Sequence, residues 1–118
     1  MRVIIAGSRT VKDYKTVCDA VEKSGFQISQ VISGNAGGVD KLGERWAKDK
    51  KVSLKVMPAE WLKYGKSAGY KRNEQMALLA DACIVIWDGE SRGSQHMINI
   101  AKDKGLKLFV LNLKETDD

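Results

Sequence analysis

Five short segments of the chain are almost wholly apolar and rich in β-branched residues. They are residues 2–6, 27–32, 52–57, 82–87 and 107–112. Strands that are buried on both faces have this composition, as in a parallel sheet that helices cover on both sides. The pattern therefore predicts five strands inside a layered structure.

Between these segments, apolar residues recur at the i, i+3, i+4 and i+7 spacing of helices with one buried face. The first helix is expected to begin near Tyr14, where Asp13 or Thr10 can cap it. Gly25 and Gly105 are expected to stop the first and the last helix. The same spacing predicts three further helices, over residues 39–46, 68–80 and 97–101.

The regular alternation of strands and helices predicts an α/β fold with right-handed crossovers. We expect a three-layer, Rossmann-like open parallel sheet of five strands in the order 3-2-1-4-5, with helices on both faces. The flavodoxin-like order 2-1-3-4-5 is the alternative. A chain of 118 residues has the length of one domain. We therefore expect a single domain over residues 1–113 and a short polar tail over residues 114–118.

The formal net charge of +5 favours anionic partners. The lysines are scattered over positions 12–114, so no basic stripe for nucleic acid stands out, and a phosphate-bearing small molecule fits the charge equally well. The two cysteines form no CxxC motif and no Cys/His cluster, so we expect neither a metal site nor a required cofactor. No run is long enough to span a membrane and no signal peptide is recognisable, which predicts a cytoplasmic protein. Association of several copies is left open.

Three predicted strands run into glycine-rich turns that lead to helices. The turns are Gly7-Ser8-Arg9, the stretch from Ser33 to Gly38, and the stretch from Asp88 to Ser94. In an open parallel sheet the carboxyl ends of the strands share one edge, and ligands bind there where the strand order reverses, between strands one and four. Glycine lets the backbone approach a ligand, and helix amino termini favour phosphate. The turns therefore predict a pocket for a nucleotide-sized ligand.

Side chains near this edge supply candidate ligand contacts. Arg9 follows the first turn and Arg72 falls early in the third helix, and a guanidinium group matches phosphate oxygens. Asp40 can either cap the second helix or bind a ribose hydroxyl. Trp61 and Tyr64 precede the third helix, where they can either stack on a base or form an apolar lid.

Two common nucleotide-binding motifs are missing. The dinucleotide fingerprint GxGxxG does not occur. Gly65-Lys66-Ser67 resembles the end of a P-loop, but Glu60 stands where that motif requires its first glycine. A Walker-type NTPase is therefore not expected.

His96 is the single histidine, and no carboxylate, serine or cysteine partner is placed beside it for catalysis.

Several stretches together resemble the YspA-like proteins of the SLOG superfamily. They are IIAGSRT, SGNAGGVDKLGERWA and the stretch from WLKYGK to IAKDKG. The superfamily also holds the DNA-processing protein A domain and the LOG cytokinin-activating phosphoribohydrolases. The resemblance extends from Arg2 to about Leu111. It implies a Rossmann-like fold, a pocket for a nucleotide or an NAD- or ADP-ribose-like ligand, and an origin in phage or bacterial systems.

The resemblance also implies site residues. It carries over to Gly7, Ser8, Arg9, Ser33, Gly34, Gly37, Gly38, Asp40, Arg72, Asn73, Ser91, Gly93 and Ser94. Together with Asp88 of the last turn, they form the expected ligand-binding set.

One position departs from the enzymes of the superfamily. LOG enzymes carry a PGGxGTxxE stretch whose glutamate supports cleavage of an N-glycosidic bond. When Gly93-Ser94 is aligned with Gly-Thr of that stretch, Met97 takes the place of the glutamate. A thioether can neither transfer a proton nor stabilise a cation by charge, and Asp88 and Glu90 are only weak catalytic candidates.

We therefore expect a protein that binds or senses a nucleotide-derived ligand. The alternatives are a hydrolase or transferase acting on such a nucleotide and, less favoured, a nucleic-acid-binding module.

Overall fold

The computed structural model describes residues 1–116, and its centre is a five-stranded sheet in which every strand is parallel to its neighbours. The strands are β1 (Arg2–Gly7), β2 (Gln30–Ser33), β3 (Ser53–Val56), β4 (Ala82–Trp87) and β5 (Lys107–Asn112). Their order is β3-β2-β1-β4-β5, as the alternation of elements predicted. The order reverses between β1 and β4, which pair with Gly7 opposite Ile86 at their carboxyl ends.

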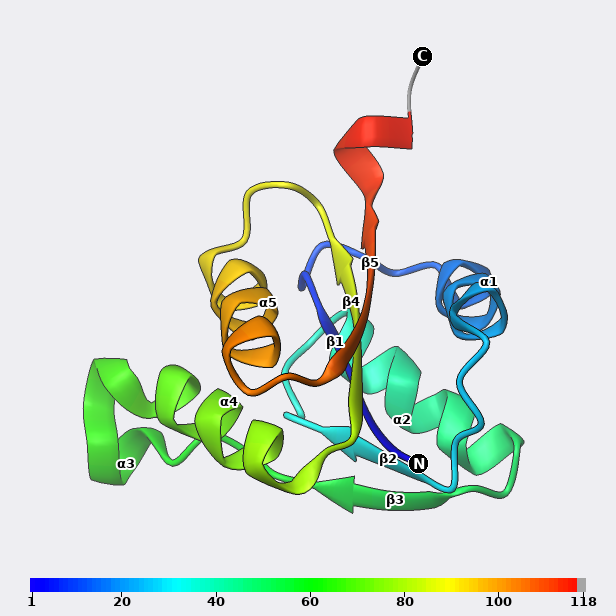
Figure 1. Cartoon of the computed structure of the whole chain (residues 1–118). Coiled ribbons are helices and arrows are strands. Elements are labelled where there is room, and N and C mark those ends of the chain that lie inside the picture. Colours follow the sequence, from blue (N-terminus) through cyan, green and yellow to red (C-terminus); the bar gives the residue numbers. More distant parts are fainter. Residues whose placement is uncertain (117–118) are drawn as a thin grey trace.

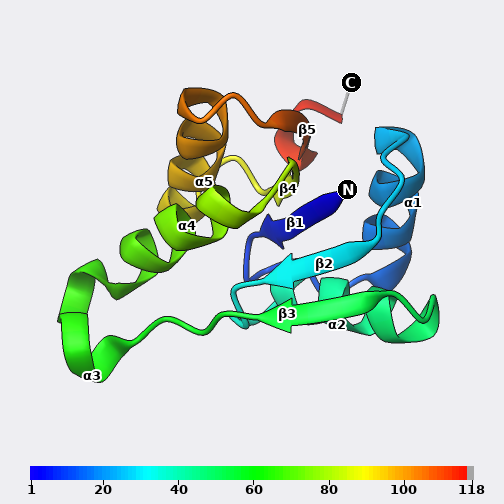
Figure 2. The same cartoon turned by 60° about the horizontal axis from the view of Figure 1, so that its bottom comes forward.

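Helices cover both faces of the sheet (Figure 2). Helices α1 (Tyr14–Ser24) and α2 (Val39–Asp49) lie on one face, and α4 (Ala68–Leu79) and α5 (Arg92–Asp103) lie on the other. Side chains alternate along a strand, so Val3 and Ile5 of β1 pack toward α1 and α2, whereas Ile4 and Ala6 pack toward α4 and α5. This two-sided burial explains why the central strands β1 and β4 are apolar along most of their length.

The ends of α1 agree with the signals in the sequence. Asp13 is the N-cap, and its side chain accepts a hydrogen bond from the backbone N–H of Lys15 at 3.1 Å. Gly25 ends the helix with a φ of 70°, the left-handed conformation that glycine adopts without strain. Gly105 has a φ of 71° just beyond α5.

The second strand begins later than predicted. We expected it from residue 27, but β2 begins at Gln30, which is the residue opposite Arg2 at the start of β1. Gln27 and Ser29 bond to the terminal residue instead: the amino group of Met1 donates to the Gln27 carbonyl oxygen at 3.0 Å, and the Ser29 backbone N–H donates to the Met1 carbonyl oxygen at 2.9 Å. A strand needs a partner along its length, and β1 is too short to provide one there.

The connection from β3 to α4 is more complex than a single helix. It contains the short helix α3 (Trp61–Tyr64) and a 3₁₀ turn, η1 (Gly65–Ser67). Neither α3 nor η1 buries a residue, so the sequence has no apolar periodicity there that would predict them. This connection projects beyond the carboxyl ends of β1, β2 and β3 (Figure 1).

The chain after β5 forms a 3₁₀ turn, η2 (Leu113–Thr116), within the segment expected as a polar tail. Residues 117 and 118 of that segment lie outside the described residues. In the part of the chain that is described, no helix is both long and apolar enough to cross a membrane.

Candidate functional site

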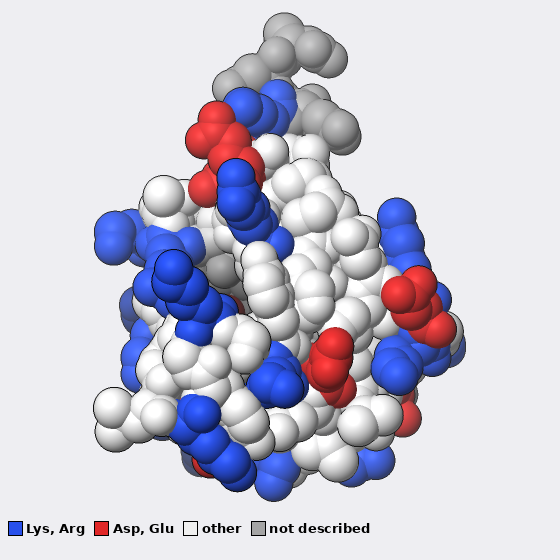
Figure 3. Space-filling model, turned by 90° about the vertical axis from the view of Figure 1, so that its left-hand side faces the viewer, with Lys and Arg blue, Asp and Glu red and all other residues white. Residues whose placement is uncertain are grey.

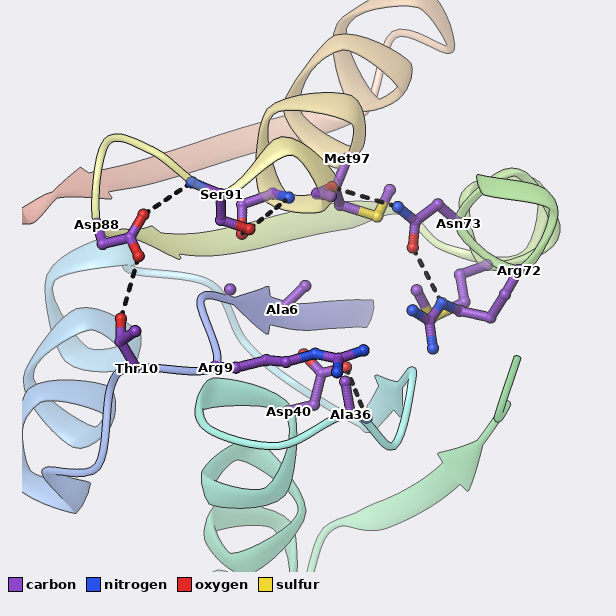
Figure 4. A pocket seen from close by; sticks show the side chains of 14 residues that line it. Ala6, Arg9, Thr10, Ala36, Asp40, Arg72, Asn73, Asp88, Ser91 and Met97 are labelled. Carbon is purple, nitrogen blue, oxygen red and sulfur yellow. Dashed lines mark hydrogen bonds between the residues drawn. The ribbon is translucent and has the colours of Figure 1, made fainter. Parts of the chain in front are cut away.

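A cavity of about 300 Å³ lies at the carboxyl edge of the sheet, where the strand order reverses (Figure 4). The β1, β2 and β4 turns and helices α4 and α5 contribute to it. Its lining consists of Ala6, Gly7, Arg9, Thr10, Ala36, Asp40, Arg72, Asn73, Met76, Asp88, Ser91, Gly93, Ser94 and Met97. Nine of these belong to the ligand-binding set expected from the sequence.

Two arginine side chains enter the cavity from opposite sides. The guanidinium group of Arg9, from the β1 turn, points toward that of Arg72, from α4 (Figure 4). Burial lowers the pKa of Arg72, the Asp40 charge opposes this effect, and the positive charge of Arg9 adds to it. The Arg9 guanidinium has no hydrogen-bond or ion-pair partner among residues 1–116. The cavity therefore holds two like charges, and within residues 1–116 neither guanidinium group forms an ion pair with a carboxylate.

Arg72 is held in place by its neighbours on both sides. Its guanidinium donates to the carbonyl oxygen of Gly34 in the β2 turn, and its Nε donates to Asn73 Oδ1 at 3.0 Å. The Nδ2 of Asn73 lies 3.4 Å from the Gly93 carbonyl oxygen and 3.1 Å from Nδ1 of His96. Burial lowers the pKa of His96, and a neutral ring can accept this hydrogen bond. These contacts connect α4 to α5 and to the β2 turn.

Asp40 is buried beneath the arginines rather than capping α2. The N-cap is Gly38, which has a φ of 68°, and Asp40 is the second residue inside the helix. Its Oδ2 accepts a hydrogen bond from the backbone N–H of Ala36 at 3.1 Å. Burial raises the pKa of Asp40, and the hydrogen bond and the Arg72 charge only partly oppose this effect.

Asp88, on the opposite wall of the cavity, differs from Asp40 in that its pKa is lowered rather than raised. Its Oδ1 accepts hydrogen bonds from the backbone N–H groups of Glu90 at 2.8 Å and Ser91 at 2.9 Å. Its Oδ2 accepts one from the Thr10 hydroxyl at 3.1 Å. The two backbone hydrogen bonds are the main reason why the pKa of Asp88 is lowered. Asp88 therefore stays ionised and holds the β4 turn in shape.

The amino terminus of α5 forms one end of the cavity. Ser91 is its N-cap and accepts a hydrogen bond from the Ser94 backbone N–H at 3.3 Å. The first turn of a helix carries a partial positive charge that favours an anion. Met76 and Met97 add an apolar surface. Met97 is almost completely buried, so its side chain packs in the core beside the cavity.

Three residues of the expected ligand-binding set, Ser8, Ser33 and Gly38, do not line this cavity or the two beside it. The catalytic candidate Glu90 does not line them either. The buried Ser8 hydroxyl accepts a hydrogen bond from the Asp88 N–H at 2.9 Å, which joins the β1 and β4 turns. The buried Ser33 hydroxyl donates to Glu44 at 2.8 Å. Glu90 lies outside, in an ion pair with Lys114 at 2.9 Å.

Two shallower cavities adjoin the first one. One, of about 220 Å³, is lined by Trp61, Lys66, Gly69 and Tyr70 together with residues of the first cavity. The other, of about 350 Å³, lies over Gly34 and Gly37 and also contacts Trp61. The set expected from the sequence did not include Lys66, Gly69 and Tyr70, because the connection from β3 to α4 has no glycine-rich turn directly after its strand. It also did not include Ala6, Thr10, Asn35, Ala36, Met76, Pro58 and Ala59.

Tyr64, which we considered together with Trp61, lines none of the three cavities. Lys63 and Lys71 lie over its ring instead, with their ammonium groups 5.1 Å and 4.9 Å from its centroid.

Positive charge predominates around this edge of the molecule. On the face in Figure 3, Lys and Arg side chains surround a hollow, and Asp and Glu side chains are fewer. Within residues 1–116, no group of three or more His, Cys, Asp or Glu side chains could hold a metal ion. The arrangement can bind an anion through the two arginines and the amino terminus of α5.

Comparison with known proteins identifies the family. A model of the YspA, cpYpsA-related SLOG family matches residues 1–64. The chain is also 35% identical to the Gene 61 protein of Mycobacterium phage D29, in an alignment that covers 92% of this chain and 94% of that protein. The chain belongs to this SLOG family. No solved structure matches it significantly. Membership in the SLOG family indicates binding or processing of a nucleotide-related ligand.

Proposed function

We propose that this SLOG protein binds a phosphorylated, nucleotide-type ligand, with the phosphate between Arg9 and Arg72. The observation that carries the proposal is the pair of guanidinium groups that point toward one another across the cavity. Two like charges repel, and the pKa of Arg72, which burial lowers most, is lowered further by the charge of Arg9. An anion placed between them removes this repulsion and accepts charge-assisted hydrogen bonds from both sides.

The surroundings of the arginines fit a nucleotide. The amino terminus of α5 adds a partial positive charge. A Cβ atom built on Gly37 or on Gly93 would meet nothing within 4 Å, so both positions leave room for a ligand. The volume of about 300 Å³ agrees with the lower end of known ligand pockets, about 300 Å³. NAD- or ADP-ribose-like molecules are the ligands that the family resemblance favours.

We infer a binding protein rather than a hydrolase. Asp88 is engaged by two backbone N–H groups and a hydroxyl, and its lowered pKa makes it a poor proton donor. Glu90 faces Lys114 outside the cavity. Met97 has no acid–base chemistry. The enzyme alternative rests on Asp40, a carboxyl group in the cavity whose pKa is raised, as general acids often require.

Calorimetric titration with AMP, ADP, ADP-ribose and NAD tests the proposal, with Arg9→Ala as the decisive variant. A hydrogen bond to a charged group contributes about 1.5–3 kcal/mol, so the substitution should weaken binding by about tenfold or more. Arg72→Ala should do the same, and the two losses should not add, because both side chains contact one anion. Arg2→Ala is the matched control, since it removes the same charge from the opposite end of β1.

Three results would reject the binding proposal. If Arg9→Ala and Arg72→Ala bind every ligand as the parent does, the anion is not between them. Chromatography of each ligand after long incubation should return it unchanged. Turnover that is lost in Asp40→Asn would establish the enzyme alternative instead. A steep fall in affinity for oligonucleotides with salt, with no binding of mononucleotides, would favour a nucleic-acid-binding module.

A further inference from the structure

The arginine pair lies at a junction between cavities. Arg9 and Arg72 line the cavity at α5 and also the two shallower ones on the side of α3. Trp61 lines both of the shallower cavities but not the first. A ligand whose anionic group sits between the arginines therefore extends, on this side, toward the Trp61 indole.

The fold does not account for the position of Trp61. Trp46 and Trp87 pack against the two apolar clusters of the core, whereas Trp61 is 52% exposed. It is the first residue of α3, a helix of four residues that buries none of them. Exposed large aromatic side chains of this kind are typical of binding surfaces, because the ring offers a wide contact area at little entropic cost.

Gly69 keeps open the space beside this indole. It is the second residue of α4 and has no positive φ, so its backbone conformation suits any residue. A Cβ atom there would lie 3.6 Å from Trp61 Cη2 and 4.0 Å from Arg72 Nη2, which are ordinary contacts. Glycine inside a helix costs about 1 kcal/mol relative to alanine. Glycine at position 69 therefore makes α4 less stable than alanine would, and its effect is to leave room in the cavity beside Trp61.

The same distances place the ring and the charge within reach of one small molecule. The edge of the indole and the Arg72 guanidinium both lie within 4.0 Å of one point above Gly69. Tyr70 lines the same cavity and packs its ring against His96, with centroids 4.4 Å apart. The cavity thus combines an aromatic surface with a cation beside it.

We propose that Trp61 is the stacking surface for a planar base, and that the ligand of this site is a nucleotide whose base lies on the α3 side of the arginine pair. The inference rests on the proposed function for the position of the phosphate. Stacking on an aromatic side chain tolerates any base, because every base has a π-face. Trp61 then contributes affinity for the ring, and Arg9 and Arg72 contribute affinity for the charge.

The experiment compares two probes that differ only in the base, AMP and ribose 5-phosphate, by calorimetric titration. AMP should bind tighter by roughly 5- to 150-fold, the range for stacking of one base on an aromatic side chain. Trp61→Ala should remove this preference and leave the affinity for ribose 5-phosphate unchanged, while Trp61→Phe should keep part of it. AMP, and not ribose 5-phosphate, should quench the fluorescence of Trp61.

Leu62→Ala is the matched control. Leu62 belongs to the same short helix, is fully exposed and lines none of the three cavities, so its loss should change neither affinity. Thermal unfolding of all variants should match the parent, since neither side chain is buried.

The outcomes separate this inference from the proposed function. If AMP and ribose 5-phosphate bind equally well and both respond to Arg9→Ala, the stacking surface is overturned and the anion site stands. If Trp61→Ala weakens both probes equally, Trp61 shapes the site without recognising a base, which also overturns the inference. If neither probe binds, this inference is overturned, and the titrations with ADP, ADP-ribose and NAD decide the proposed function by themselves.

Discussion

Two groups of glycines surround the candidate site, and they differ in what the fold demands of them. Gly7 and Gly38 leave no room for a side chain, since a Cβ atom would lie 2.1 Å from the Ile86 carbonyl oxygen and 2.3 Å from the Ser8 carbonyl oxygen, respectively. Gly37, Gly69 and Gly93 have neither a positive φ nor a neighbour closer than 3.6 Å to such an atom. Each of these three nevertheless lines a cavity.

The difference separates structural glycines from candidate ligand-binding glycines. The first group lets the β1 turn pack against β4 and the start of α2. The second group contributes nothing to backbone conformation or to packing, and the two glycines inside helices each cost helix stability. We propose that these three positions are glycine because a ligand occupies the space that a side chain would fill. Variants that fill each position test the comparison directly.

The largest effect is expected for Gly7→Ala. The methyl group would overlap the Ile86 carbonyl oxygen and approach Val39 Cγ2 at 2.8 Å, so β1 and β4 would have to separate. We expect the free energy of unfolding to fall by about 3 kcal/mol, the upper end for overpacking in a tight site. Urea denaturation measures it. An unchanged midpoint would show that Gly7 belongs with the second group.

Gly93→Val should separate binding from stability. The valine would fill open space at the amino terminus of α5, so we expect AMP affinity to fall by more than about tenfold while the free energy of unfolding changes by about 0.5 kcal/mol. Gly37→Val should behave in the same way. Asn99→Val, on the exposed side of α5, controls for a branched residue in this helix. Normal AMP binding by both glycine variants would show that Gly37 and Gly93 are not ligand-binding positions.

Gly34 stands between the groups, because a Cβ atom there would approach Arg72 and Asp40 rather than backbone.

The protonation of Asp40, which lies beside Gly34, can be tested by the dependence of stability on pH. Its pKa is raised above the ordinary 3.8, so the folded chain binds a proton more readily than the unfolded chain. This contribution to stability is fully present below pH 3.8 and is lost as pH rises through the folded pKa. Relative to the parent, Asp40→Asn should therefore gain stability as pH rises through that window.

Asp88→Asn is the contrasting variant. The pKa of Asp88 is lowered, so its contribution is present above its ordinary value of 3.8 and is lost as pH falls through the folded pKa. Asp88→Asn should thus be less stable than the parent at neutral pH and approach it in acid. Denaturation of both variants from pH 3 to pH 8 checks the opposite signs. Parallel curves would mean that the two carboxyl groups share one environment.

The smallest effect is expected for Gly69→Ala. Its methyl group makes only ordinary contacts and improves the helix, so stability should rise by up to about 1 kcal/mol. The same methyl group narrows the space beside Trp61, so AMP affinity should fall a few-fold while that for ribose 5-phosphate stays constant. Differential scanning calorimetry and titration provide the two readouts. A loss of stability would assign Gly69 to the structural group.

The strands and helices were predictable because their signals are local. The β4 and β5 ranges agree with the predicted segments, and Asp13 and Gly25 delimit α1 as expected. The position of the cavity followed as well, because the carboxyl ends of parallel strands share one edge whatever the details of the turns. Helix α3 was not predictable, since it is short and buries no residue.

The order of the elements, the parallel sheet and the turns that meet at its edge could be read from the sequence, which favoured the observed strand order over one alternative. Which side chains face the cavity became visible only in the folded chain. Ser8 and Ser33 lie in turns at this edge yet bond inward, and Asp40 and Asp88, alike in sequence, have pKa values shifted in opposite directions. Periodicity records which face of an element is buried. The direction of a turn side chain, its hydration and its partners depend instead on residues distant in the chain, which meet only when the sheet has formed.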